Sequence, residues 1–543
     1  MGANISSLPT CLAAVVAFIT YTYTYIRRRH SFLSQLRGPK SHSFWIGNEG
    51  DIYYQNEVGD CEFEWVQQFG SALRRRGCLG EDHLMVADPK ALQYILHSSG
   101  YSFPKRRDVV KVTEMVAGKG LVCAHGEVHE RQRKISAPVF FTSRLKMFIP
   151  TFQEVSSKLV QRWKDELATL DPSIPLLINV APWISRATLD IMGQAGFDLH
   201  FGTLDGAETE LSKMYGGLFI DSTLYPSPLN LIFKSTWRYI PEFLLQHVRY
   251  LPTREYRRFR TYLDCARDFS REIIKKNAEK GDGSDMMSVL LHTNASEDPQ
   301  NRMRHEEVVD QLSALLLAGQ ETTASTLTWF LWEIARHPES QERIREEVAA
   351  IYKRTGASGA ELSAADLDSM AYTQAVLKES MRLHPIIWML SRVAGQDDAI
   401  PLAFPVTTKS GRLVSSIPVK KGTLIDIALH AYQRLPEVWG EDAGEWNPDR
   451  FLEPENVKQT SIGVYGNLLN FSGGLQGCIG WRFAVCEMLV IVTTLVKHFE
   501  FSLPPEREGE KTPRICRKPT VLMMPMAEGQ VGPWMGLVVE PLN

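Results

Sequence analysis

A segment of 33 residues, from Arg304 to Arg336, contains no proline and a single glycine, and it restricts the possible folds more than any other feature. At a rise of ~1.5 Å per residue, it predicts a helix of roughly 50 Å, long enough to cross a whole domain. Apolar residues lie on most faces of its middle, so we expect the helix to be buried. Four polar residues argue against a membrane span: Asp310, Gln311, Gln320 and Glu321.

The middle of this segment combines small and polar residues. Ala318 and Gly319 leave one side of the helix thin, so a bulky group can lie against it. Glu321 and Thr322 then place a carboxylate and a hydroxyl in an apolar helix, which is costly unless they are satisfied or used. Two interpretations follow: a functional pair, or a threonine that bonds to its own helix beside a glutamate that pairs elsewhere.

A second feature is a glycine-rich loop from Phe471 to Gly480, in which four glycines surround Cys478. An apolar helical pattern follows from Arg482 to Phe501. Backbone N–H groups of the loop and the positive end of the helix favour the thiolate, which is the form that binds metal. No second ligand stands at zinc-site spacing, so the loop suits a metal whose other ligands come from a macrocycle. The alternative is a buried structural cysteine.

Glu379 and Arg382 form a third feature, because positions three apart share one helix face and can form an ion pair. Pro385 predicts that their helix ends near His384. Taken alone, this pattern indicates an ordinary surface ion pair, which contributes little to stability.

The rest of the chain reads as one continuous, helix-rich body without internal repeats. Short β-rich runs within residues 411–427 flank Lys421-Gly422 and predict a small sheet. Ser363 predicts a helix start, and residues 277–302 read as a mostly polar connection. The expected fold class is therefore mainly α with a minor β region.

Composition excludes several functional classes. A net charge of −3 provides no basic field of the kind that nucleic-acid binding requires, so we expect no nucleic-acid partner. Eight cysteines in 543 residues, with no CxxC pair, argue against a disulfide scaffold and a zinc ribbon. Sparse, unpaired cysteines also indicate a reducing compartment.

The first 30 residues predict a membrane anchor. Residues 1–26 carry no charged side chain, their apolar part runs from Leu8 to Ile26, and three arginines follow. Nineteen residues at ~1.5 Å each span roughly 28 Å, just enough for a bilayer core. Charge that follows the apolar run argues against a cleaved signal peptide and places the remaining chain in the cytosol. We expect a single-pass anchor at residues 1–30 and a catalytic domain at residues 31–543; a myristoylation pattern at Gly2 and a glycosylation sequon at Asn4 are competing short motifs.

The three features, in this order, resemble the cytochrome P-450 family of haem-thiolate monooxygenases, and most of all its microsomal and fungal members. The resemblance covers nearly the whole chain after the anchor and implies the cytochrome P-450 fold behind one N-terminal transmembrane helix. The family's motifs match these residues: Phe471, Gly474, Cys478 and Gly480 in the haem loop, Glu379 and Arg382 in the Glu-x-x-Arg motif, residues 318–323 in the oxygen-activation segment, and residues 447–451, whose Arg450 completes a buried triad.

The resemblance implies a role for each matched residue. Cys478 would be the axial thiolate ligand of the iron of haem b. Glu321 and Thr322 would be catalytic, the first as the acid that supplies protons through water and the second as the alcohol that assists oxygen activation. The other expected cofactor-binding residues are Phe471 in the loop and, near the haem propionates, His129, Arg133 and Arg392.

The resemblance also implies a reaction, in which one oxygen atom of O2 enters a lipophilic small molecule and the other becomes water. Electrons would come from an NADPH-dependent cytochrome reductase docked on the face near Cys478, with both proteins at the endoplasmic reticulum membrane. The expected pocket is lined by residues 101–121, Leu315, Ala318 and residues 386–389 and is mostly apolar, which favours a lipophilic substrate. The resemblance to fungal members, rather than any residue, implies a terpenoid-like or other secondary metabolite. Two alternatives remain: a haem-thiolate isomerase or peroxide-rearranging enzyme, and a non-enzymatic, membrane-anchored haem carrier.

Gln476 departs from the family's pattern, which has an arginine at this position for a haem propionate. Glutamine is neutral and offers only amide hydrogen bonds. Propionate charge would then be met by His129, Arg133 and Arg392 alone, so we expect weaker haem retention than is usual in the family.

Overall fold

The computed structural model describes residues 31–169, 176–215, 218, 223–280, 283–355, 361–453, 455, 458, 460–505 and 513–542. The expected anchor at residues 1–30 lies outside these ranges, and no helix within them is long and apolar enough to cross a membrane. The helices are α2 (Glu49–Tyr53), α3 (Asp60–Phe69), α4 (Pro89–Gln93), α5 (Arg107–Ala117), α6 (Gly126–Ser136), α7 (Thr142–Ala168), α8 (Val180–Phe197), α9 (Glu210–Tyr215), α11 (Pro228–Thr236), α12 (Glu242–Leu245), α13 (Arg254–Lys280), α14 (Met286–Ser296), α15 (His305–Arg336), α16 (Pro338–Thr355), α17 (Ala364–Ser369), α18 (Ala371–Leu383), α19 (Leu429–Tyr432), α20 (Pro436–Trp439) and α21 (Trp481–His498).

Strands form four small sheets beside this helical body. A four-stranded sheet has the order β1 (Ala72–Arg76), β2 (Asp82–Val86), β7 (Leu424–Ala428) and β4 (Met389–Val393), with only β2 and β7 parallel. The other sheets are the hairpin of β5 (Asp398–Thr407) and β6 (Leu413–Val419), the trio of β3 (Leu176–Asn179), β11 (Gly536–Pro541) and β8 (Phe499–Ser502), and the hairpin of β9 (Ile515–Pro519) and β10 (Met523–Ala527). The predicted class, mainly α with minor β, is confirmed.

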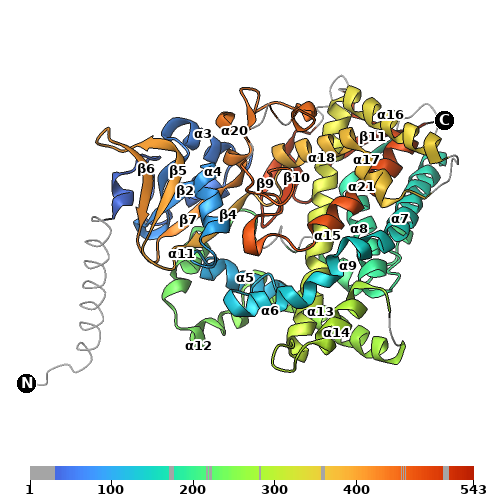
Figure 1. Cartoon of the computed structure of the whole chain (residues 1–543), viewed down its shortest axis with the longest axis horizontal. Helices are drawn as coiled ribbons and strands as arrows, with labels where there is room; N and C mark the ends of the chain where they lie inside the picture. Colours follow the sequence, from blue (N-terminus) through green and yellow to red (C-terminus); the bar gives the residue numbers. More distant parts are fainter. Residues whose placement is uncertain are drawn as a thin grey trace, which may run out of the picture.

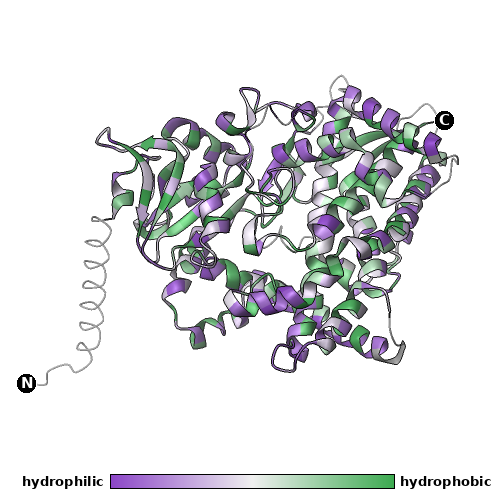
Figure 2. Cartoon of the chain, in the orientation of Figure 1, coloured by the Kyte–Doolittle hydropathy of each residue, from purple (hydrophilic) through white to green (hydrophobic). Residues whose placement is uncertain are grey.

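The long helix α15 runs through the middle of the helical half, and the strands β1, β2 and β5–β7 form a separate lobe (Figure 1). Helix α15 packs against α8, α13 and α21. Its observed range differs by one residue from the predicted 304–336, because Arg304 is the N-cap. Figure 2 shows hydrophobic residues along the strands of the lobe and hydrophilic residues on outer helices such as α6. The helix that carries the central polar residues is thus a core element, as predicted.

The helix bounds that were predicted from a capping residue or a proline are confirmed. Ser363 caps α17 with a capping box, and α18 ends at Leu383, directly before His384. The two strands around Gly422 are also present, but they do not pair with each other, since β6 joins β5 while β7 joins β2 and β4. The polar connection at 277–302 contains the helix α14, whose first turn is capped by Asp285.

Candidate functional site

One side of α15 is accessible in the middle of an otherwise buried helix. Ala318 is exposed, and Leu315 and Thr322, which share its helix face, are half-buried. Gly319 serves a different purpose, because a Cβ atom there would lie 2.4 Å from the Sδ atom of Met192 on α8. The expected thin side of the helix therefore has two parts: Gly319 admits a neighbouring helix, and Ala318 leaves space beside the predicted catalytic pair.

The predicted pair, Glu321 and Thr322, lies at this point of α15. The Thr322 hydroxyl donates a hydrogen bond of 2.6 Å to the carbonyl oxygen of Ala318, so the threonine does bond to its own helix. Its oxygen can still accept a hydrogen bond from another donor. Glu321 makes no ion pair with the described residues, and burial alone raises the pKa of its carboxyl to about 7. An acid with this pKa can give up and regain a proton near neutral pH.

The loop around Cys478 depends on close backbone contacts. Gly474 has a φ of +66°, and a Cβ atom on it would lie 1.7 Å from the carbonyl oxygen of Leu96. The N–H of Cys478 donates to the carbonyl oxygen of Phe471 at 2.8 Å, which closes the loop before α21 begins. Because only glycine tolerates both the φ and the contact, the glycine-rich sequence fixes the position of the cysteine.

The Cys478 side chain is exposed although protein surrounds it, so the sulfur faces internal space. Burial raises the pKa of its thiol, while the N–H of Gly480 and the charge of Arg133 lower it. The predicted preference of the loop for thiolate is therefore real but smaller than the effect of burial. A bound metal cation would tip this balance, since a coordinating thiol is deprotonated outright.

The Glu379–Arg382 pair is fully buried, and the surface interpretation of the sequence is wrong. Arg382 donates two hydrogen bonds of 2.7 and 2.8 Å to the carboxylate of Glu379. Arg450 donates from Nε at 3.2 Å, and the backbone N–H of Asn447 donates at 2.8 Å. Neither Glu379 nor Arg382 has any exposed surface. The triad implied by the resemblance is therefore present, with each charge satisfied.

A cluster of unpaired cations tests whether haem fits beside this loop. Arg392 on β4 is 4% exposed, and burial lowers the pKa of its guanidinium to about 10. Lys105 lies directly opposite it in an antiparallel bridge, and burial lowers the pKa of that amine to about 8. Neither side chain pairs with a carboxylate in the described part of the chain. Buried cations without counter-charges are costly, and two propionate groups would supply the missing negative charge, so the residues fit haem.

His129 and Arg133 lie on α6, beside the same cluster. The Tyr101 hydroxyl is 2.7 Å from Nδ1 of His129, and burial and nearby cations lower the pKa of this imidazole to about 4. Arg133 donates to the carbonyl oxygen of Gly477 at 2.7 Å, next to Cys478. His129 is thus neutral near pH 7 and can offer hydrogen bonds but no charge, whereas Arg133 offers both.

Gln476 lies at the edge of this cluster, where its amide is 3.4 Å from Nδ1 of His125. A small cavity of about 10 Å³ is lined partly by Tyr101, His125, Arg392 and Gln476. His125 and Lys105 were not predicted as members of the cluster. Lys105 stands beside Arg106, Arg107 and Asp108 in the sequence, so no local pattern marked it.

Gln476→Arg is expected to slow the loss of haem, because a guanidinium would add a charge-assisted hydrogen bond to a carboxylate in this cluster. The measurement is the rate of haem transfer from the holoprotein to an excess of an apoprotein acceptor. Gln476→Lys is a useful companion, since it adds the charge without the planar fork. Equal transfer rates for the wild type and Gln476→Arg would contradict the assigned contact.

Glu487 on α21 is a third residue that was not predicted from the sequence. It is 0% exposed, and neither of its carboxyl oxygens has a hydrogen-bond partner within the described ranges. Burial raises the pKa of this carboxyl well above its usual value, and the nearby Thr323 hydroxyl lowers it only in part. Burial therefore favours the protonated form of the Glu487 carboxyl. Its only signal in the sequence was a glutamate inside the apolar pattern that follows Cys478.

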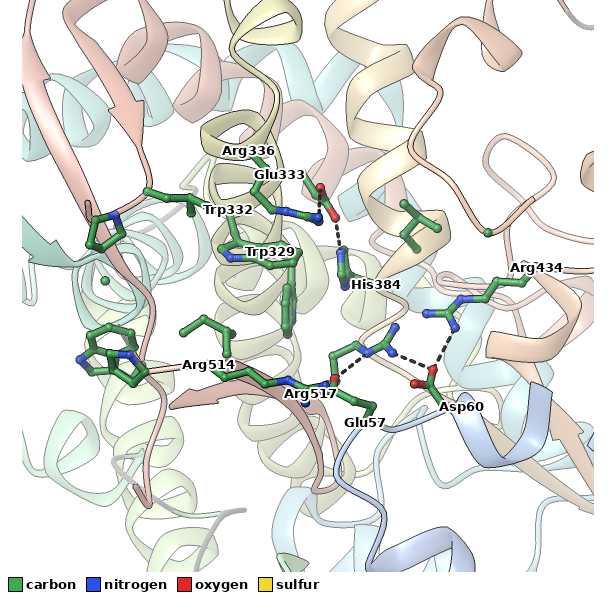
Figure 3. Close-up of a pocket in the computed structure, with 18 residues that line it drawn as sticks. Glu57, Asp60, Trp329, Trp332, Glu333, Arg336, His384, Arg434, Arg514 and Arg517 are labelled. Carbon is green, nitrogen blue, oxygen red and sulfur yellow. Dashed lines mark hydrogen bonds and ion pairs between the residues drawn. The ribbon is translucent and has the colours of Figure 1, made fainter. Parts of the chain in front are cut away.

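A cavity of about 630 Å³ lies away from all of these residues and contains none of the predicted site (Figure 3). Trp329 stacks on His384 at 4.3 Å along one wall, and His384 lies 2.6 Å from Glu333. Asp60 on the opposite side accepts from Arg434 at 3.0 Å and Arg517 at 2.7 Å. Because its charged groups pair with one another, this cavity is a polar junction between α3, α15 and β9.

The residues expected to line the substrate pocket differ in their exposure. Trp388 is 6% exposed, and its indole N–H donates to the carbonyl oxygen of Thr520 at 3.0 Å, so it packs against the β9–β10 hairpin. Ile386 is also buried, whereas Ile387 and Met389 are half-buried. Leu315 and Ala318 on α15 remain accessible, as predicted.

Comparisons with known proteins agree with this arrangement. A family model described as Cytochrome P450 matches residues 38–531. "Cytochrome P450 monooxygenase claU" of Ampulloclitocybe clavipes is 29% identical over 97% of this chain and 96% of its own length. "Cytochrome P450 monooxygenase 205" of Postia placenta is 31% identical (94% and 93%), and "Ganoderic acid synthetase CYP5150L8" of Ganoderma lucidum is 31% identical (92% and 93%). The chain therefore belongs to the cytochrome P450 family, as a haem-thiolate monooxygenase of the type found in fungi.

Proposed function

We propose that this enzyme inserts one oxygen atom of O2 into a lipophilic small molecule, with electrons from NADPH supplied by a separate cytochrome reductase. The substrate class we propose is a terpenoid-like or other secondary metabolite. The accessible, apolar strip of Leu315 and Ala318 beside Glu321 and Thr322 is the observation that carries the proposal. One of the similar fungal proteins is named as a ganoderic acid synthetase, which is consistent with a lipophilic substrate.

Haem b, held by the Cys478 thiolate, would supply the oxygen-activating chemistry when bound. Arg133 and Arg392 would hold its propionates, and His129 would hydrogen-bond to them. Glu321 would give protons through water, and Thr322 would hold that water in place through its hydroxyl. Phe471 would fix the loop through its carbonyl oxygen, which accepts a hydrogen bond from the N–H of Cys478.

The rival functions differ in their need for electrons. An isomerase or peroxide-rearranging enzyme turns over without reductase, and a haem carrier forms no product. The test is to co-express the chain with a reductase and screen lipophilic compounds for a substrate-induced Soret shift, then follow product formation. Product that depends on both NADPH and reductase supports the proposal, whereas product formed without them would overturn it.

Glu321→Gln and Thr322→Ala are expected to uncouple turnover. Because the pKa of Glu321 is about 7, its carboxyl holds a proton below neutral pH and loses it above. The wild-type yield of product per NADPH should therefore fall between about pH 6 and about pH 8, and Glu321→Gln should give a low yield without this dependence. Thr322→Ala should release hydrogen peroxide instead of product. The measurements are product, peroxide and NADPH consumed; an unchanged yield in either variant contradicts the assigned role.

We also propose that the enzyme lies at the endoplasmic reticulum membrane with its catalytic domain in the cytosol. The expected anchor is supported by large apolar side chains that are exposed on the catalytic domain: Trp45 (63%), Leu229 (79%), Phe243 (64%) and Tyr250 (64%). Leu229 and Phe243 belong to α11 and α12, which both lie in the lower left part of the molecule in Figure 1. Recovery of the full-length protein in the soluble fraction after cell lysis would contradict this proposal.

A further inference from the structure

Asp310 and Gln311 in the first half of α15 hold the loop between α5 and α6. The Oδ2 atom of Asp310 accepts a hydrogen bond from the backbone N–H of Lys119 at 2.7 Å. The Oε1 atom of Gln311 accepts one from the backbone N–H of Leu121 at 2.8 Å. Both side chains are buried, at 4% and 2% exposure. Two consecutive helix residues thus bind alternate N–H groups of the irregular segment between α5 and α6.

The loop is shaped to accept these two side chains. Gly118 has a φ of +73°, and a Cβ atom there would lie 2.4 Å from Cγ of Asp310. A Cβ atom on Gly120 would lie 3.0 Å from Oε1 of Gln311. Any side chain at Gly118 would displace the carboxylate, so the glycines and the polar pair of α15 fit together as one contact.

A third element joins this contact. Arg267 on α13 donates from Nε to Oδ1 of Asp310 at 2.7 Å, and from a terminal nitrogen to Oδ2 at 3.1 Å. This two-point pairing fixes both the position and the plane of the carboxylate. Asp310 therefore links α13, α15 and the 118–121 loop through a single side chain.

The loop lies at the end of the accessible strip on α15. Gln311, Leu315, Ala318 and Thr322 are spaced by four, three and four residues, which places them along one helix face. Leu121 is itself buried and belongs to the segment expected to line the substrate pocket. The bond from Leu121 to Gln311 thus sets where this wall of the pocket stands relative to Thr322.

We propose that Asp310, held by Arg267, is a positioning residue that keeps the 118–121 wall of the pocket in the shape that bulky ligands require. The inference rests on the proposed function and deepens it, since it names what controls the size of the accepted substrate. Without the ion pair between Arg267 and Asp310, the 118–121 loop must be ordered each time a bulky ligand binds. The cost of that ordering lowers affinity, whereas a small ligand that does not reach the wall is unaffected.

Two azoles of different size test this on the ferric holoprotein. Imidazole is small, and clotrimazole is a bulky imidazole; both give a red-shifted Soret band when their nitrogen binds the iron. Arg267→Gln and Asp310→Asn should each weaken clotrimazole about tenfold, or ~1.4 kcal/mol, and leave the imidazole affinity unchanged. Hydrogen exchange at the amides of residues 118–121 should become faster in both variants.

Arg271→Gln is the matched control. Arg271 lies one turn further along α13 and also pairs with an acid of α15, Glu306, at 3.0 Å, but on the exposed surface. It should leave both azole affinities and the exchange of residues 118–121 unchanged. If Asp310→Asn fails to retain haem, the comparison of Arg267→Gln with Arg271→Gln decides the matter alone.

Three results would overturn the inference: clotrimazole affinity that is unchanged or increased, an equal loss for both azoles, or unaltered exchange at residues 118–121. Each of these results differs from a failure of the proposed function. If the proposed function failed, the wild-type protein itself would lack the carbonyl band of a thiolate-bound haem or would form product without electrons from a reductase.

Discussion

Cys478→Ser is expected to abolish both the red-shifted carbonyl band of the reduced haem protein and its monooxygenase activity. Serine keeps the shape of the loop, since the bond from its N–H to Phe471 is a backbone contact. Its hydroxyl does not ionise near neutral pH, so it cannot replace a thiolate ligand and its electron donation. The measurement is the ferrous–carbonyl difference spectrum, recorded with total haem on the same sample.

Cys486→Ser provides the control for this experiment. Cys486 is half-buried on α21, eight residues after Cys478. Its replacement should leave the carbonyl band unchanged. Survival of the band in Cys478→Ser would remove the basis for the assignment of the ligand.

Glu379→Gln is expected to have the largest effect on stability. The change leaves Arg382 and Arg450 buried with too little negative charge, at 0% and 4% exposure. Removing one partner of a buried ion pair costs about 3–5 kcal/mol, a large part of the roughly 5–15 kcal/mol that stabilises a typical domain. We expect a low yield of haem-containing protein and a strongly reduced midpoint in thermal unfolding.

Lys420→Gln is the control for charge removal, because it breaks an exposed pair with Asp397 whose two side chains are 72% and 60% exposed. Exposed pairs contribute about 0–1 kcal/mol, so its unfolding midpoint should stay near that of the wild type. If Glu379→Gln were no less stable than Lys420→Gln, the triad would not be a structural requirement of this fold.

The sequence predicts well those features that neighbouring residues decide. The bounds of α15 follow from the lack of proline between Arg304 and Arg336, and the end of α18 follows from Pro385. The glycines around Cys478 likewise predict a tight loop, because a φ of +66° at Gly474 excludes other residues. In each case the deciding interaction lies within a few positions of the residue itself.

Features that join distant segments could not be predicted in this way. The polar character of Asp310 is visible in the sequence, but its partners Lys119 and Arg267 are 191 and 43 residues away. The burial of Glu379 depends on Asn447 and Arg450, which only the resemblance connected to it. The β-rich runs around Lys421-Gly422 predicted a small sheet but not its strand order: β6 pairs with β5, and the hydrogen bonds of β7 go to β2 and β4.

Because α15 is one uninterrupted helix, we expect this protein to tolerate insertions within it poorly. Asp310 and Glu321 are 11 residues apart, as are Gln311 and Thr322, and this spacing is close to three full turns. Inserting one residue between the two pairs would rotate one against the other by about 100°. The residues proposed to handle protons and those proposed to hold the pocket wall therefore keep one relative orientation, which the helical repeat sets. The number of residues between the two pairs cannot change even where the side chains can.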